Sequence, residues 1–548
     1  MDKKRLNALL FVTFVFSVIM LWDAWQRAHK PPPAPEAEAA ANVVPGAPAA
    51  SGPVPTIAAT PAATVPAANV PKAVVHTDLI TAEISAQGGD LIFLELEKHR
   101  ATLDASKNFV LLQNDPKQHI YVAQSGLIGE GLPNHKTTFT LEKSEYTLAD
   151  GEESVSVRMT APAANGAKIA KIYTFKRGSY LIDVSYEISN GSDAVLAPYG
   201  YFQILRDGKD PEAHNHGPFG VTTFTGPAMY TDADKYQKVS FADIDKGKAS
   251  YAHKADNGWV GLVQHYFFSA WLPQGKAERE FYMDRLDSSL YRVGVKFPLA
   301  TVEPGKTAQV SVPLYAGPQE QDKLESIAPG LDRVVDYGFL TIIASPLFWV
   351  MQHFHAFIGN WGWTIIALTV LLKLIFFPLS AASYKSMAKM RVVMPQMTRI
   401  KETYKDDRQR MNVEMMDLYK REKINPLGGC LPVVVQIPVF IALYWVLLGT
   451  VEIRNAPWLG WITDLSVQDP WYVLPVIMGA TMFFQTRLNP TPPDPVQAKL
   501  MTWMPVAFTV MFLWFPAGLV LYWTVNNLLS IAQQWYITRQ IEAAAANK

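Results

Sequence analysis

The sequence predicts an α-helical, multi-span membrane protein that also carries a large exported all-β domain. Long runs without charge fill much of the chain after residue 337, and such runs are typical of membrane helices. Between residues 74 and 335, short segments alternate apolar and polar residues, which predicts half-buried strands. The length of 548 residues also favours two or more domains.

The N-terminal apolar run predicts a first membrane anchor within residues 1–30. Residues 6–22 carry no charge and follow Lys3, Lys4 and Arg5. A cleaved signal peptide is the alternative, but no small-x-small cleavage site follows the run directly. We expect an uncleaved span with its basic end in the cytoplasm.

The next apolar stretch, from residue 337, is too long for one crossing and is interrupted at Gly359-Asn360. Its first part, 338–358, predicts an amphipathic helix lying at the membrane interface, within a segment 336–360. The span itself is expected at 361–380, where Trp361 opens the helix at interface level.

Three more uncharged runs complete the predicted membrane core at 361–540. The runs at 425–451 and 470–486 each fit one span. The run at 500–538 is about 58 Å long as a helix, close to two bilayer cores. Because 515–518 reads Phe-Pro-Ala-Gly, we expect a helical hairpin there, which gives six spans in total and a cytoplasmic tail at 541–548.

The charges of the loops set the expected orientation. Residues 385–423 are rich in Lys and Arg, whereas the loop 452–469 has Arg454 as its only basic residue. Basic loops stay in the cytoplasm, so both termini are expected there and the β domain outside.

The exported part begins with a linker. Residues 31–73 are rich in Pro and Ala and cannot bury enough apolar surface to fold. The domain at 74–335 alternates clearly at 182–188 and at 154–159, which predicts an antiparallel β-sandwich. Three loop histidines could suggest chemistry but match no metal motif, and incidental placement is favoured; they are His214, His216 and His253.

Lys373 is the most informative residue of the membrane part. A cation inside the hydrocarbon region either extends to the headgroups or faces a polar cavity open to the cytoplasm. Thr369 shares its helix face. Other polar residues in the spans could line the same cavity or join helices, namely Gln436, Tyr522, Thr524, Asn526 and Asn527.

The basic segment 382–423 predicts a cytoplasmic helical hairpin. Its methionines recur at helical spacing and form either a packed seam or an adaptable surface for apolar partners; they are Met387, Met390, Met394, Met397, Met411 and Met415. The nearby basic residues are expected to lie near anionic headgroups or a ribosome.

Several function classes find no support. Cys430 is the only cysteine, so no intramolecular disulfide or cysteine metal site can form. A formal net charge of zero gives no indication of nucleic-acid binding. No nucleotide, hydrolase or metalloprotease motif is found, and we expect neither an enzyme nor a cofactor.

At its longest motifs the chain resembles the YidC membrane-insertase family, which includes the Oxa and Albino proteins. The resembling segments are YKSMAKMRVVMPQ (384–396), EKINPLGGCLPVVVQIPVFIALYW (422–445), DLSVQDPWYVLPVIMGATMFFQ (464–485) and FLWFPAGLVLYW (512–523). The basic N-terminus, the Pro/Ala linker and the β domain resemble the Gram-negative branch of this family.

The resemblance implies a five-helix insertase core with a hydrophilic groove, open to the cytoplasm and closed outside, in the inner membrane. Lys373 stands where the family has a groove arginine, so the charge is kept and the planar fork is lost. Groove contacts carry over to Thr369, Gln436, Tyr522 and Trp523, where Trp523 replaces a tyrosine found in relatives. The periplasmic domain resembles a β-supersandwich. Implied partners are nascent membrane proteins, lipid, the Sec translocon and a ribosome.

Two other functions stay open on the residues alone. A transporter would use Lys373 as a substrate or proton site, but the spans show no repeat symmetry. A tethered carbohydrate enzyme would need paired carboxylates in a cleft of the β domain.

Overall fold

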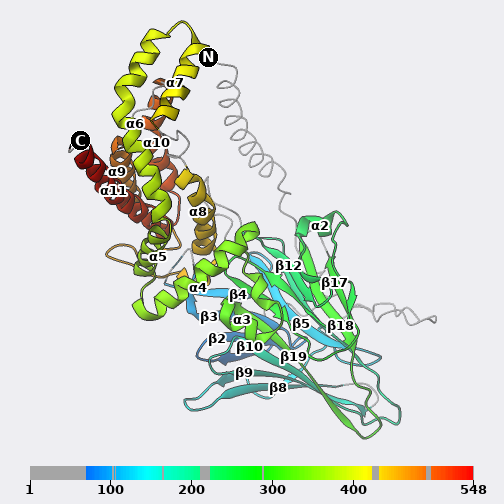
Figure 1. The fold of residues 1–548 in the computed structure, drawn as a ribbon. Helices are drawn as coiled ribbons and strands as arrows, with labels where there is room; N and C mark the ends of the chain where they lie inside the picture. Colours follow the sequence, from blue (N-terminus) through cyan, green and yellow to red (C-terminus); the bar gives the residue numbers. More distant parts are fainter. Residues whose placement is uncertain are drawn as a thin grey trace.

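The computed structural model describes residues 70–101, 104, 106–162, 166–209, 223–286, 289–422, 431–488 and 495–546. The predicted anchor, most of the linker, His214, His216 and Cys430 lie outside the described residues. The six-span count therefore stays a prediction. The described chain forms a β domain and a group of helices, joined through helix α4 (Figure 1).

The first sheet of the β domain has ten strands in the described chain. Its order is β14-β17-β18-β11-β5-β4-β3-β2-β1-β7. The strands are β1 (Lys72–His76), β2 (Ile80–Ser85), β3 (Leu91–Arg100), β4 (Asn108–Asp115), β5 (His119–Ile128), β7 (Glu145–Thr147), β11 (Tyr199–Asp207), β14 (Lys254–Ala255), β17 (Arg279–Arg285) and β18 (Leu290–Pro298).

The second sheet has nine described strands in the order β13-β12-β15-β16-β19-β10-β9-β8-β6. They are β6 (Thr140–Leu141), β8 (Ser154–Pro162), β9 (Lys168–Lys176), β10 (Leu181–Ser189), β12 (Gly226–Thr231), β13 (Lys235–Lys238), β15 (Trp259–Val263), β16 (Phe267–Trp271) and β19 (Thr307–Pro318). The short helix α2 (Phe241–Asp245) follows β13.

The predicted alternation is confirmed in β10. Ile182, Val184 and Ile188 are buried, whereas Asp183 and Glu187 between them are partly exposed. β10 pairs antiparallel with β9 on one side and with β19 on the other. Because alternate side chains of a strand point to opposite faces, this pattern turns one apolar row toward the core. The all-β class of the domain is confirmed.

The β domain leads into the helices through a compact connection. It consists of α3 (Gln321–Ile327) and the 3-10 turns η4 (Leu331–Val334) and η5 (Gly338–Leu340), followed by α4 (Thr341–Ile358). α4 ends at Gly359, whose φ of 72° suits glycine, and Asn360 caps the next helix by accepting from Trp363 N. The break predicted at Gly359-Asn360 is thus present, and α4 occupies the segment expected for the interfacial helix.

The basic segment forms the expected helical hairpin. α5 (Trp361–Ile375) and α6 (Phe377–Thr403) are bent by 65° relative to each other, and α7 (Arg408–Arg421) runs back beside α6. Asp407 caps α7 by accepting from Arg410 N. In Figure 1 this hairpin extends from the helical part on the side away from the β domain.

The last helices are α8 (Leu431–Gly449), followed by the 3-10 turn η6 (Val451–Ile453), then α9 (Val473–Leu488), α10 (Pro495–Phe512) and α11 (Ala517–Ala546). The turn predicted near 515–518 separates α10 from α11. Among the described residues, no helix is alone both long and apolar enough to cross a membrane, but the bent pair α5–α6 meets that requirement jointly. Shorter apolar helices are Val435–Gly449, Val473–Leu488 and Ala498–Phe512.

Candidate functional site

Lys373 lies buried between helices, with its ammonium turned toward α11. Its side chain comes from the last turn of α5, and only 5% of the residue is exposed. Lys373 Nζ donates to Ser530 Oγ at 2.7 Å, and Ser530 Oγ in turn donates to the Asn526 carbonyl at 2.7 Å. Lys373 forms no ion pair with any residue in the described part of the chain. The cation therefore rests on one neutral hydroxyl rather than on a carboxylate.

Two other residues predicted for the groove, Thr369 and Asn526, differ in their relation to Lys373. Thr369 is buried one turn earlier on α5, but its hydroxyl donates to Ile365 O of its own helix at 2.7 Å. Asn526 is half-buried on α11, and its carbonyl supports Ser530. The hydrogen bond between Lys373 and Ser530 joins α5 to α11.

Tyr522 and Trp523 lie about 12 Å from Ser530 along α11 and belong to an aromatic group instead. The Tyr522 ring stacks on Phe440 of α8 at 6.3 Å between centroids. Trp523 contacts Phe440 edge-on at 4.6 Å and also approaches two rings of α10, Phe508 and Phe512. Gln436, half-buried, lies one turn before Phe440 on α8.

Three polar residues near this region were missed by sequence reasoning, namely Ser530, Tyr384 and Thr481, whereas Asn527 was among the predicted ones. Ser530 carries the contact to Lys373, and Tyr384 of α6 also hydrogen-bonds to Ser530. Asn527 Nδ2 donates to Thr481 Oγ1 of α9 at 3.3 Å. Tyr522, Asn526 and Ser530 recur every four residues and therefore lie on one face of α11. This spacing could have identified Ser530 as a candidate groove residue from the sequence.

The N-terminal end of α11 is held by backbone pairing to the loop before α9. The loop before α9 forms a β-bridge between Gln468 and Pro516. Ala517 N donates to Val467 O at 2.7 Å, and Gly518 N donates to Leu465 O at 2.9 Å. These bonds occupy the free amides at the N-terminus of α11 and tie it to the loop.

The hairpin combines a packed seam with exposed apolar residues. Val393, Met397 and Leu418 form its buried centre, with Met390 and Met415 packed against it. The remaining predicted methionines, Met387, Met394 and Met411, are half-buried outside that cluster. The most exposed apolar side chains of the hairpin are others, namely Val392, Val413 and Met416.

The hairpin is also attached at its base. Arg391 of α6 and Gln534 of α11 both donate to the Leu488 carbonyl at the end of α9, the latter at 3.1 Å. Three helices thus meet at one backbone oxygen, which fixes where the hairpin leaves the helical core.

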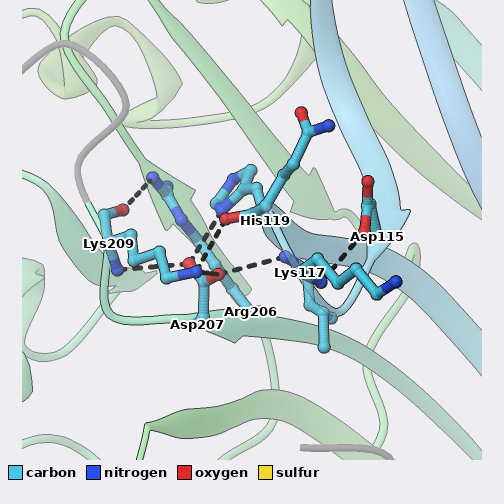
Figure 2. Close-up of polar contacts among 8 residues, drawn as sticks. Asp115, Lys117, His119, Arg206, Asp207 and Lys209 are labelled. Atoms are coloured by element: carbon cyan, nitrogen blue, oxygen red, sulfur yellow. Dashed lines mark hydrogen bonds and ion pairs between the residues drawn. The ribbon is translucent and has the colours of Figure 1, made fainter. Parts of the chain in front are cut away.

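In the β domain, one histidine–carboxylate pair is well ordered by its neighbours (Figure 2). His119 Nδ1 lies 2.7 Å from Asp207 Oδ1, and Asp207 also accepts from Ile120 N and Lys209 N. Burial opposes ionisation of Asp207, but the hydrogen bonds from His119 and the two amides hold its pKa below the usual value. The pair joins the ends of β5 and β11, a structural role.

Of the three histidines considered from sequence, only His253 is described. Its ring packs against Tyr251 at 4.3 Å between centroids. Among the described residues, no group of three or more His, Cys, Asp or Glu side chains is arranged to hold a metal ion.

Comparison with known proteins covers nearly the whole chain. The family model described as "YidC periplasmic domain" matches residues 72–350, and the model described as "60Kd inner membrane protein" matches residues 353–544. The "Membrane protein insertase YidC" of Aromatoleum aromaticum is 58% identical, covering 99% of this chain and 98% of the relative. The chain belongs to the YidC family. The YidC protein of Dechloromonas aromatica is 55% identical, covering 100% of this chain and 99% of the relative.

A solved structure is also similar. The crystal structure titled "Active YidC insertase crystal structure with the first transmembrane domain resolved" is 18% identical, with a TM-score of 0.41, covering 85% of this chain and 92% of that chain. The boundary between the two YidC family models falls inside α4, between residues 350 and 353. The helix that joins the two parts of the fold therefore also joins the two family regions.

Proposed function

We propose that this YidC-family protein inserts client transmembrane segments into the inner membrane and helps them fold, through a hydrophilic groove open to the cytoplasm. Lys373 supplies the positive charge that attracts acidic residues of the client. The groove lies between α5, α8 and α11, with Thr369, Gln436, Tyr522, Trp523 and Asn526 along it. Both termini face the cytoplasm and the β domain faces the periplasm.

The burial of Lys373 beside a neutral partner carries the proposal. A buried cation is costly unless it is paired or faces water. Extension to the headgroups would turn Nζ away from α11, yet the hydrogen bond to Ser530 directs it between the helices. A cation held in this way, with no carboxylate of its own in the described chain, is available to a carboxylate of the client.

Insertion by this route needs no nucleotide. Water in the groove lowers the cost of moving a short polar tail into the membrane. Burial of the client's apolar surface then supplies roughly 25 cal/mol per Å². A single contact between Lys373 and a client carboxylate in a hydrated groove is weak enough to release the client afterwards.

The hairpin and the β domain have subsidiary roles in this proposal. The partly buried methionines and the exposed Val392, Val413 and Met416 offer an adaptable apolar surface to an emerging client. The basic residues of the hairpin face anionic lipid or a ribosome. The periplasmic domain contacts the Sec translocon, which receives part of the clients.

Reconstitution tests this proposal. Purified protein in liposomes is given a two-span client with an acidic periplasmic loop, and protease protection of that loop is measured. We expect protection with wild type and Lys373→Arg, partial loss with Lys373→Ala and full loss with Lys373→Glu. Lys385→Glu, which reverses an exposed charge of α6, is the matched control and should insert normally. Equal protection with empty liposomes would refute insertion, and no effect of Lys373→Glu would refute the role of the charge.

A further inference from the structure

Arg454 connects the membrane core to the periplasmic β domain through an aromatic cage. It follows η6, in the loop after α8, and is 8% exposed. Its guanidinium carbon lies 5.4 Å from the ring centre of Phe109, 5.5 Å from that of Tyr266 and 5.4 Å from that of Phe267. Phe109 and Phe267 stack on each other at 4.1 Å, so two sides of the cage are fixed by packing within the β domain.

The cage lies beside further contacts between the two parts. His265, next to the cage residue Tyr266, has its Nε2 2.9 Å from the Leu448 carbonyl in α8. Val451 and Ile453 of η6 are buried, and the Thr450 hydroxyl donates to Val446 O at 2.7 Å. We call residues 448–456 and their β-domain partners the domain joint. The joint fixes the periplasmic end of α8.

The same loop is connected to α11 through backbone hydrogen bonds. Ala456 N donates to Ile453 O at 3.2 Å, and Leu465 N donates to Ala456 O at 3.0 Å. Gly518 N of α11 then donates to Leu465 O at 2.9 Å. The loop held by the β domain is therefore bonded at both ends to helices that carry candidate groove residues.

We propose that Arg454 is a positioning residue, through which the periplasmic domain sets the spacing of α8 and α11 and thereby the shape of the groove. This inference rests on the proposed function only for its effect on insertion. Its structural part, the spacing of α8 and α11, is tested by distances within the protein, independently of insertion.

An arginine at position 454 favours a role in coupling the β domain to the helices over a role in filling the space between them. An apolar side chain would pack against three rings without the desolvation cost of a guanidinium. A cation over ring faces adds directional attraction, which is stronger when it is desolvated. The result is a contact with a preferred geometry, as is needed to fix one part of a protein relative to another.

Spin-label distances in the full-length protein test the inference. With Cys430→Ser as background, one label pair joins the β domain to the core (Lys168 and Val476), and the other joins α8 to α11 (Val435 and Leu528). All four label positions are exposed. Distances are measured by pulsed electron paramagnetic resonance in lipid nanodiscs, and insertion is measured in parallel in liposomes.

Arg454→Leu should broaden both distance distributions and lower insertion about tenfold, as the loss of a desolvated cation–π cluster predicts. Arg454→Lys keeps a cation and should restore narrow distributions and most of the insertion. Arg487→Leu is the matched control, because Arg487 stacks on Phe483 within α9, outside the joint. If Arg454→Leu does not fold, Tyr266→Leu removes one ring and should broaden the same distances.

Unchanged distances in folded Arg454→Leu would overturn the inference, as would a change in the domain–core pair that leaves the α8–α11 pair unaltered. If both distances broaden while even the wild type inserts no client, the positioning role stands and the proposed function fails.

Discussion

The Lys373 ammonium donates a 2.7 Å hydrogen bond to the Ser530 hydroxyl, which joins α5 to α11 inside the helical core. Both residues are buried, at 5% and 3% exposure. Ser530 also donates to the Asn526 carbonyl, so its oxygen is oriented to accept from the lysine. The contact fixes the position of the charge and leaves the other N–H groups of the ammonium directed elsewhere.

Ser530→Ala should reduce insertion of acidic clients by about tenfold, because hydrogen bonds to charged groups contribute roughly 1.5–3 kcal/mol. Insertion of a client without acidic residues should change little. Thr524→Ala is the control, since the Thr524 hydroxyl donates to Val520 O of its own helix. Ser530→Thr should restore activity. Equal losses for both alanine variants would contradict a specific role for Ser530. Protease protection of the client loop provides the measurement.

Gly479→Ala should destabilise the helical core. A Cβ at this position of α9 would lie 2.0 Å from Thr509 Oγ1 of α10, so Thr509 or the helix that carries it would have to move. Overpacking of this kind costs roughly 1–3 kcal/mol. Gly449→Ala is the comparison, because the nearest atom there is 3.8 Å away. Thermal unfolding in detergent should show a lower Tm for Gly479→Ala alone, and equal Tm values would argue against this helix contact.

Lys171→Met should destabilise the β domain. Lys171 is fully buried, and its Nζ donates to Gly88 O and Ser125 O near Asp90. Burial raises the pKa of Asp90 and lowers that of Lys171, while their mutual attraction opposes both shifts. Loss of one buried partner costs about 3–5 kcal/mol.

Circular dichroism of the full-length protein should show this loss as earlier melting of the β-sheet signal. Lys168→Met, which changes an exposed lysine on the same strand, should melt as wild type. A wild-type melting curve for Lys171→Met would mean that the buried charge contributes nothing to the fold.

The domain joint should loosen as the pH rises toward about 8. Burial raises the pKa of Glu452 from its ordinary 4.5 to about 8, and Glu320 and Asp322 add to the shift while Lys323 opposes it. The docked state thus holds a proton that the undocked state releases. Docking therefore weakens from about pH 4.5 to pH 8.

His99 acts in the opposite sense at lower pH. Burial, Arg454 and Lys323 lower its pKa from 6.5 to about 4, so docking weakens as the pH falls through this window. Above pH 6.5 the His99 effect ends, whereas the Glu452 effect continues to about pH 8. The domain–core distance distribution should broaden between pH 6.5 and 8.5 in wild type and stay constant in Glu452→Gln. Identical pH profiles would exclude Glu452 as the titrating group.

The sequence predicted the elements that depend on local pattern. The alternation around Ile182, the break at Gly359-Asn360 and the hairpin turn near Pro516 are confirmed because each is set by neighbouring residues. Lys373 could be singled out because a cation in an apolar run is conspicuous without any structure.

Contacts between distant segments could not be predicted in the same way. Ser530 is 157 residues from Lys373, and a serine in a membrane helix most often bonds to its own backbone. Arg454 was noted only as a loop charge, since its aromatic partners lie in separate strands of the β domain. The client-contact role of the hairpin methionines stays a prediction.

Reversal of the charge at position 373 and of the charges in the client loop tests the central claim most directly. Two clients are compared in liposomes, one with an acidic periplasmic loop and one with the acidic residues replaced by lysine, using wild type and Lys373→Glu. We predict that wild type protects the acidic loop better, and that Lys373→Glu reverses this preference. If both proteins insert the two clients in the same ratio, the charge at Lys373 does not select the client, and the proposed mechanism is contradicted.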